Sequence, residues 1–326
     1  MKPSTRWTPS SPAPCPAFAG KMTASVPQKD DAPAPLEKVQ ARAAFWFLLP
    51  AYSLYVLFVL LPALATIVFT FLYLDRYTWT AEFVGFDNIL YVLADGRFWT
   101  SFRNTFYFVF LAAIGNVGLG LVFAAVLDRA LPKAMLYILR LAFFLPVLVS
   151  TALVSLVWQF IYSSDLGVLN YYITSIGLPR IGWLSDERVA MISVVIMDVW
   201  KHFGFFMIIL LAALQSIPRE ITEAAEMDGS GPLATFFFIK IPMIAPVILF
   251  CVTYATIGGL QMFESVRILT SGGPGDATTS MVMYMYEQAF SSQDIGAGSA
   301  AALVLLITIV IVTLVQLKLG TRAVDQ

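Results

Sequence analysis

The sequence has few charged residues, and this scarcity decides its broad class. Asp, Glu, Lys and Arg together make up 13% of its 326 residues, whereas 59% are hydrophobic and the mean hydropathy is +0.78. A water-soluble domain carries about 25% charged residues. The composition therefore excludes a soluble globular protein and indicates an integral membrane protein.

Residues that carry catalysis, metal binding or crosslinks are scarce as well. His202 is the single histidine, and no group of His, Cys and carboxylates has metal-ligand spacing. The two cysteines, one in the N-terminal tail and one inside an apolar run, suggest no disulfide framework. No Gly-x-x-x-x-Gly-Lys-Ser/Thr loop is present, so the chain does not hydrolyse ATP by that device. The net charge of -1 excludes a strongly basic nucleic-acid binder. We expect no catalytic or metal site in this chain.

Long apolar runs, by contrast, are abundant. Crossing the hydrocarbon core of a bilayer takes about 20 residues of helix. The runs are continuously apolar and lack the period of two that a membrane β-barrel requires. The pattern predicts an all-α membrane protein with six transmembrane helices, near residues 44–74, 104–127, 136–162, 189–215, 241–264 and 297–319.

The positions of Lys and Arg predict the orientation. Of these residues, 13 lie in the N-terminal tail, the loops after the second and fourth runs and the C-terminal end, against 6 on the opposite side. Both termini should therefore be cytoplasmic. Residues 1–42, rich in Pro, Ala and Ser, are interpreted as a disordered cytoplasmic tail that precedes a membrane domain at 43–326. Met22, followed by Thr-Ala-Ser, offers an alternative start of translation.

The charged segment between the fourth and fifth runs, residues 216–242, has the most distinctive pattern. It contains Glu223-Ala-Ala-Glu-Met-Asp-Gly-Ser-Gly. Pro218 suits the first turn of a helix, and a carboxylate in the early turns interacts favourably with the helix dipole. Gly229 can end the helix in a left-handed conformation. A short cytoplasmic helix from about Pro218 to Asp228 is predicted.

With Ile217-Pro218 upstream, this segment closely resembles the Glu-Ala-Ala motif of binding-protein-dependent ABC importer permeases. In that family it forms a coupling helix that inserts into a cleft of the nucleotide-binding subunit. The resemblance implies the type I ABC importer permease fold. Ser230 stands where the family usually has Ala, and a small residue is thus kept. The residues implied to contact the ATPase are Glu223, Ala224, Ala225, Asp228 and Gly229, and those implied to anchor the helix are Phe236, Ile239 and Pro242.

Two further stretches, 211–218 and 269–279, are similar to sugar permeases of the maltose and glycerol-3-phosphate kind. The resemblance implies a multi-pass subunit of the bacterial plasma (inner) membrane, paired with a second permease subunit. A cytoplasmic ATP-binding dimer and an extracytoplasmic sugar-binding protein would complete the assembly. This chain would then be no enzyme and hold no cofactor, since ATP and Mg²⁺ would bind the partner ATPase. Which sugar, polyol or glycerol phosphate is carried, and which permease subunit holds it, stay open.

Ionisable groups at membrane depth are candidates for the solute path, because burying each charge there costs a few kcal/mol or more. In the fourth run, Asp198, Lys201 and His202 share one helix face. Mutual neutralisation of Asp198 and Lys201 explains the pair slightly better than a ligand does. For His202 we expect packing or a hydrogen bond and no proton relay.

The fifth run supplies the second candidate set, in which an amide, a carboxylate and aromatic rings suit a carbohydrate. Lipid anchoring explains the ring of Phe263 equally well. Asn104 and Asn116 in the second run are expected to form helix–helix hydrogen bonds. The full set of candidate path residues is Gln261, Phe263, Glu264, Tyr254, Asp198 and Lys201.

An alternative interpretation is an ion-coupled secondary transporter of a small polar solute. Asp198, Lys201 and Glu264 would then carry the coupling ion. Such folds often contain inverted repeats, and this sequence has no clear repeat. The alternative also leaves the segment 216–242 unexplained. The Gly272-Gly-Pro-Gly275 sequence lacks the Lys of a phosphate loop and predicts a tight external turn.

Overall fold

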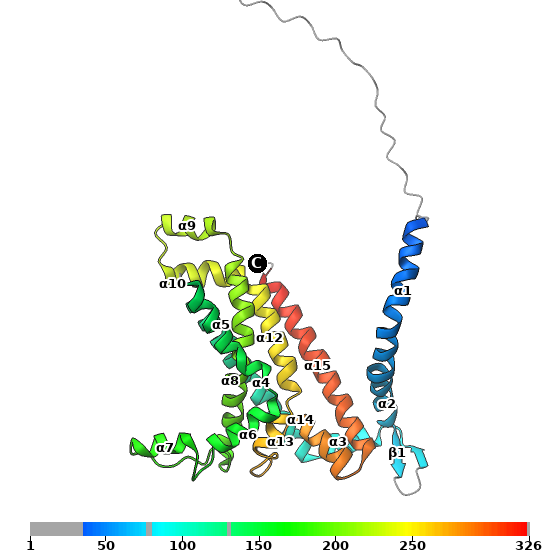
Figure 1. The fold of residues 1–326 in the computed structure, drawn as a ribbon. Coiled ribbons are helices and arrows are strands. Elements are labelled where there is room, and N and C mark those ends of the chain that lie inside the picture. The colour runs from blue at the N-terminus through cyan, green and yellow to red at the C-terminus, as the bar shows by residue number, and fades with distance from the viewer. Residues whose placement is uncertain (1–34, 76–79, 129–131, 325–326) are drawn as a thin grey trace, which may run out of the picture. The chain divides into compact units, whose positions relative to one another are not determined.

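The computed structural model describes residues 35–75, 80–128 and 132–324, which are mainly helical (Figure 1). Residues 1–34 of the predicted disordered tail lie outside the described residues. From Pro35 the chain is helical, so the predicted tail boundary at residue 42 is wrong. Proline is well suited to open a helix, because its missing N–H has no partner at that position. The chain divides into two compact units, Met1–Leu57 and Phe58–Gln326.

The first unit contains α1 (Pro35–Tyr55), which carries Pro50 in its interior and runs into a π-helical turn, η1 (Val56–Leu60). The second unit continues with α2 (Leu61–Phe69). The predicted first span, 44–74, extends too far. Residues Leu72–Asp75 form strand β1, which pairs antiparallel with β2 (Thr80–Phe83) and so satisfies its backbone groups outside a helix.

The other elements of the second unit are helical. In chain order they are α3 (Asp87–Ala94), α4 (Gly96–Leu127), α5 (Lys133–Leu148), α6 (Thr151–Ile161), α7 (Val168–Ser175), α8 (Glu187–Gln215), α9 (Arg219–Met227), α10 (Pro232–Thr235), η2 (Phe236–Lys240), α11 (Ile241–Met243), α12 (Ala245–Leu260), α13 (Glu264–Leu269), α14 (Met281–Tyr286), η3 (Glu287–Ser291) and α15 (Ile295–Val324).

Within the described ranges, four helical stretches are long and apolar enough to cross a membrane: Gln40–Phe69, Gly96–Leu127, Glu187–Gln215 and Ile295–Gly320. Two bent pairs bring the number up to six if each counts as one span. Helices α5 and α6 meet at 97°, and the segment Pro232–Met243 meets α12 at 71°. Four of the six predicted spans are thus continuous helices, and the other two fall on bent helix pairs.

The predicted span 136–162 corresponds to the bent pair α5 and α6. Pro146 lies in the last turn of α5, and Val149 and Ser150 adopt extended backbone angles before α6 begins. Proline lacks the N–H needed to continue the helix, which explains why the chain turns at this place. The predicted span 241–264 also ends early, at Leu260, so Phe263 and Glu264 lie beyond it.

Helix α8 lies at the centre of the second unit. In the most apolar 18-residue stretch of α8, 56% of the residues are buried, whereas the corresponding share in α15 is 17%. Helix α8 packs against α4 and α5, where Val194, Met207 and Leu210 are completely buried. Cys251 of α12 is equally buried. The α4–α8 interface carries the polar groups described below.

Candidate functional site

Helix α9 lies at one end of the helical unit, between α8 and α10 (Figure 1). It spans Arg219–Met227, which confirms the helix predicted from Pro218 to Asp228 with those two residues as its flanking caps. Pro218 has extended backbone angles and precedes the first turn, where it was expected inside that turn. The element is therefore set by local sequence signals at both ends.

The C-terminal end of α9 is closed by Gly229, whose φ of +81° is left-handed as predicted. The N–H of Gly229 donates to the carbonyl of Glu226 (3.0 Å), and the N–H of Ser230 donates to that of Ala225 (2.9 Å). These two bonds satisfy carbonyls that the end of the helix leaves free. Pro232 then opens α10 directly after the extended Gly231, so α9 and α10 are joined by a short, ordered turn.

The two alanines of the motif lie in different environments. Ala225 is buried, with 7% of its surface exposed, whereas Ala224 is exposed. Of the two residues implied to contact the ATPase, Ala225 thus faces the chain itself and Ala224 the surface. Met227 (88% exposed) and Asp228 lie on the accessible surface.

Under α9 there is a polar cavity of about 520 Å³. Glu223 is exposed and lines this cavity together with Glu226 and Arg219 of the same helix. The opposite wall is formed by the ends of α4 and α8 and by η2, through Asp128, Leu214, Gln215, Ile217 and Lys240. Carboxylates and cations thus face one another across a space large enough for side chains of another protein.

Residues 236–242 form the return segment, which leads from α9 back to the long helices and contacts them in two ways. Phe236 packs against the buried cluster that contains Leu214 and Ile244, and Ile239 is partly buried, while Pro242 is exposed. Lys240 forms an ion pair with Asp128 at 2.7 Å, and both side chains are mostly buried. A carboxylate at the C-terminal end of a helix such as α4 is unfavourable to the helix dipole, so Lys240 stabilises it. This pair was not predicted, because 112 positions separate the two residues.

Replacing Lys240 with Met should destabilise the protein by about 1–3 kcal/mol, because the Asp128 carboxylate loses a charge-assisted hydrogen bond. Adding Asp128→Asn to Lys240→Met should recover most of this loss, because the uncompensated charge is then gone. Thermal unfolding in detergent measures both effects. Lys133→Met is the control, since Lys133 is exposed at the start of α5. Additive losses in the double variant would contradict the pairing.

A second cavity, of about 590 Å³, lies between α4, α8 and α12 and is lined mainly by apolar residues, with a few polar side chains among them. Asn116, Asp198, His202, Tyr254 and Gln261 line it, so three of the six predicted path residues meet here. The amide of Asn116 donates to Asp198 Oδ2 at 3.0 Å, which confirms a helix–helix hydrogen bond. Asp198 Oδ1 lies 3.0 Å from Nδ1 of His202, one helical turn along.

Lys201 forms no direct ion pair with Asp198 among the described residues, but the Asp198 carboxylate acts on its charge at longer range, as the predicted mutual neutralisation requires. Its Nζ lies 3.4 Å from the carbonyl of Val147 and 3.4 Å from Nε2 of His202, and 4% of the residue is exposed. Spacing by four positions, as in Asp198 and His202, aligns side chains as well as spacing by three. The expected hydrogen-bonded role of His202 is confirmed.

Phe263 and Glu264 do not line this cavity. The ring of Phe263 packs on Tyr286 with centroids 5.1 Å apart, and Glu264 is exposed as the first residue of α13. The chain leaves the helical conformation after Leu260, so neither side chain is part of the cavity lining, although the Glu264 carboxylate still acts on the charge of Lys201.

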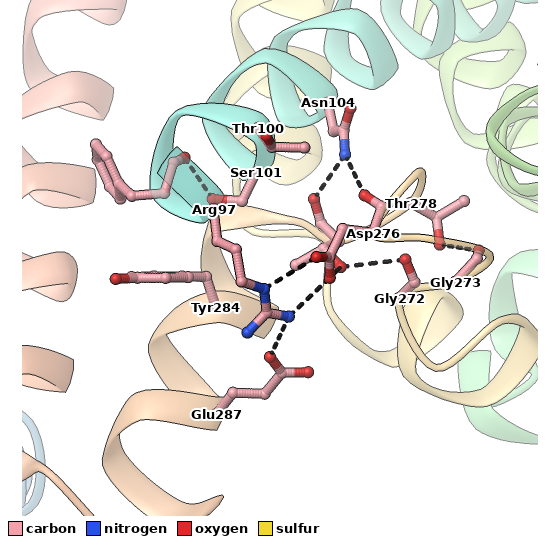
Figure 2. Close-up of polar contacts among 12 residues, drawn as sticks. Arg97, Thr100, Ser101, Asn104, Gly272, Gly273, Asp276, Thr278, Tyr284 and Glu287 are labelled. Carbon is pink, nitrogen blue, oxygen red and sulfur yellow. Dashed lines mark hydrogen bonds and ion pairs between the residues drawn. The ribbon is translucent and has the colours of Figure 1, made fainter. Parts of the chain in front are cut away.

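At the end of the unit opposite α9, a polar network holds the predicted tight turn (Figures 1 and 2). Arg97 donates to both carboxylate oxygens of Asp276, at 2.7 and 3.0 Å, and to Glu287 at 2.9 Å. The guanidinium of Arg97 keeps the pKa of Asp276 below its ordinary value, so the carboxylate stays charged near neutral pH. Asn104 donates to the backbone carbonyls of Asp276 (2.8 Å) and Thr279 (3.2 Å), so its partner is this turn and no helix.

Comparison with known proteins places these features in context. Residues 116–324 match the family described as binding-protein-dependent transport system inner membrane component. The probable ABC transporter permease protein YurN of Bacillus subtilis (strain 168) is 31% identical over 281 residues, 84% of this chain and 94% of the relative. The trehalose/maltose transport system permease protein MalF of Thermococcus litoralis is 31% identical over 86% of this chain and 94% of its own.

The sn-glycerol-3-phosphate transport system permease protein UgpA of Yersinia enterocolitica is 30% identical over 86% of this chain and 94% of its own. Among solved structures, a chain of a bacterial alginate ABC transporter, crystallised with a pentasaccharide-bound periplasmic protein, aligns with a TM-score of 0.78. The alignment covers 89% of this chain and 98% of that one at 20% identity. The likeness shows a shared fold.

Proposed function

This chain belongs to the family of binding-protein-dependent transport system inner membrane components, and on that premise we propose that it is a permease subunit of an ATP-driven sugar importer. Relatives named for trehalose/maltose, lactose and glycerol-3-phosphate transport support a sugar or polyol derivative as its solute. The assembly would lie in the bacterial inner membrane with both termini cytoplasmic. It would contain a second permease subunit and an extracytoplasmic sugar-binding protein. Membrane lipid would surround the two permease subunits.

The observation that carries the proposal is α9 with the cavity beneath it. The capped helix presents Met227 and, across the turn, Leu233, which are 88% and 70% exposed. Carboxylates of Glu223 and Glu226 line the cavity, where they would accept hydrogen bonds from basic side chains of a partner. An apolar tip beside charged groups is typical of a protein interface. The partner would be a cytoplasmic ATPase dimer, which would bind ATP and Mg²⁺ while this chain catalyses no reaction.

The connections of η2 would transmit movement of the ATPase to the membrane helices. Lys240 ties the return segment to the end of α4, and Phe236 ties it to the cluster around α8 and α12. Those three helices also line the cavity with Asp198. A shift of α9 would thus change the spacing of helices around the cavity, in an alternating-access cycle.

The cavity between α4, α8 and α12 would form part of the solute path. It combines the amides of Asn116 and Gln261, the carboxylate of Asp198 and the ring of Tyr254. Sugars bind through hydrogen bonds to such polar groups and through contact of their apolar face with an aromatic ring. These polar groups support a sugar, which is polar, better than a purely apolar solute.

Gln261→Ala should raise the solute concentration for half-maximal uptake about tenfold, because one to two hydrogen bonds of about 1 kcal/mol each are lost. Glu264→Ala should change uptake little, since Glu264 lies outside the cavity lining. Uptake of labelled solute into vesicles, at equal amounts of assembled complex, measures both. A larger effect for Glu264→Ala than for Gln261→Ala would reject this cavity as the path.

The test of the proposed function is co-purification of the chain with the products of neighbouring genes. ATP hydrolysis is then measured in lipid, with the candidate binding protein either empty or loaded with a series of sugars. Stimulation by one loaded protein would support the importer and identify its solute. Uptake that needs no ATPase and follows an imposed ion gradient would support the ion-coupled secondary transporter.

A further inference from the structure

A third cavity lies at the end of the unit opposite α9. Its volume is about 440 Å³, and it opens to the surface between the N-terminal parts of α4 and α8 and the turn that follows Gly272, with exposed charged side chains on its walls. Arg103 and Tyr107 of α4 line it, together with Glu187 and Arg188 of α8. The cavity is distinct from the one at Asp198, but it lies along the same pair of helices. Nine residues of α4 separate Tyr107 from Asn116, or about 14 Å.

One wall of this cavity is rigidly held. Gly275 and Ala277 line it, and they flank Asp276, which is bound by the guanidinium of Arg97 and by the amide of Asn104 (Figure 2). Gly275 has a φ of +53°, and a Cβ there would lie 2.6 Å from Oε1 of Glu187. Glycine is favoured at this position by its left-handed φ, because the carboxylate end of Glu187 could rotate away from a Cβ. The bonds of Arg97 and Asn104 are what hold this side of the cavity.

The two arginines of the cavity have no anionic partner among the described residues. Two other arginines at this end form ion pairs, Arg97 with Asp276 and Glu287, and Arg180 with Asp165 at 3.0 Å, and Arg267 lies over the ring of Tyr286 at 5.5 Å. No ion pair or side-chain hydrogen bond joins the guanidinium of Arg103 or Arg188 to the parts of the chain that the structure describes. Glu187 contributes one negative charge, so the three ionised side chains leave one net positive charge.

We propose that this cavity binds the anionic group of a small sugar-like solute, through the guanidinium groups of Arg103 and Arg188. The planar guanidinium matches the oxygens of a carboxylate, sulfonate or phosphate and forms paired hydrogen bonds with them. Tyr107 adds a ring and a hydroxyl for the sugar itself. This inference rests on the proposed function, and it adds that the transported class includes charged sugars, which the cavity binds before they reach the cavity at Asp198.

The test is protection of arginine from chemical modification in the assembled complex. Phenylglyoxal modifies accessible guanidinium groups, and peptide mass spectrometry measures the rate at each position. Glucuronate and glucose 6-phosphate should slow modification of Arg103 and Arg188 severalfold, while uncharged glucose should not. The rate at Arg180, which lies outside the cavity, should stay unchanged. Equal protection by glucose, or equal protection of Arg180, would overturn the inference.

Charge variants sharpen the result. Arg103→Gln should weaken protection of Arg188 by the charged sugars about tenfold, because one charge-assisted contact is lost. Glu187→Gln should strengthen protection, because it removes a repelling carboxylate. Arg180→Gln is the matched control and should change nothing. Unaltered protection in both cavity variants would overturn the inference.

The assay needs neither ATP nor a binding protein, so it is independent of the test of the proposed function. ATP-dependent uptake without protection by charged sugars would overturn only the anion site. Protection by an acidic binding protein, without protection by the charged sugars, would also overturn it and would indicate a protein contact at these arginines. Protection without any ATP-dependent uptake would retain the anion site and reject the importer.

Discussion

Gly229→Pro should abolish co-purification of the ATPase partner while leaving the chain in the membrane. Gly229 has a φ of +81°, whereas the proline ring fixes φ near −65°. Proline also removes the N–H that donates to the carbonyl of Glu226 at 3.0 Å. The turn between α9 and α10 would then adopt another conformation and displace Met227 and Leu233, the exposed apolar residues on either side of it. ATP hydrolysis stimulated by the binding protein should fall to the unstimulated level.

Gly177 provides a closely matched control. Its φ is +83°, its N–H donates to the carbonyl of Thr174 at 3.0 Å, and a Cβ at either glycine would meet no atom within 4 Å. Gly177→Pro thus imposes the same local strain at the end of α7, and the ATPase should still co-purify. Glu223→Lys tests the surface without backbone strain and should also release the ATPase. Normal retention of the ATPase by Gly229→Pro would reject the docking role of α9.

Gly204→Leu should prevent accumulation of folded protein. Gly204 lies in the buried face of α8, and a Cβ there would collide with the carbonyl oxygen of Phe143 and lie 2.6 Å from its carbonyl carbon. These are backbone atoms of α5, so no side chain can rotate to make room. Small residues permit this kind of close helix approach in membranes. Overpacking costs about 1–3 kcal/mol or more, and a displaced α5 would also disturb the environment of Lys201.

Gly118→Leu is the control for this prediction. Gly118 lies in α4, where a Cβ would meet nothing within 4 Å. The yield of monodisperse protein in detergent and its thermal unfolding should match those of the unmodified chain. Gly204→Ala should lie between the two, with reduced yield. Equal yields of Gly204→Leu and Gly118→Leu would show that α5 and α8 do not approach as closely as described.

Features that depend on neighbouring residues were predicted well. The helix α9 and its left-handed end at Gly229 follow from a cap and a glycine a few positions apart, which act within one or two turns. The approximate positions of the apolar spans follow from the cost of exposing polar groups to lipid. The range of the span broken near Pro146 was predicted but its bend was not, because hydropathy measures transfer from water and carries no direction.

Features that join distant parts of the chain were not predicted. Arg97 and Asp276 are separated by 179 positions, and Asp128 and Lys240 by 112. Asp198 was paired with its near neighbour Lys201, but its carboxylate binds Asn116 on another helix and His202 on its own.

The sequence by itself determined that this protein is a multi-pass helical membrane protein with a short capped helix between its fourth and fifth spans. Both conclusions rest on solvation and on hydrogen bonding within a few residues. Only the tertiary structure decided which polar groups meet, because helix packing selects partners by side-chain shape and direction across elements far apart in the chain. It separated Glu264 from Gln261, and it brought two unpaired arginines, Arg103 and Arg188, to one cavity.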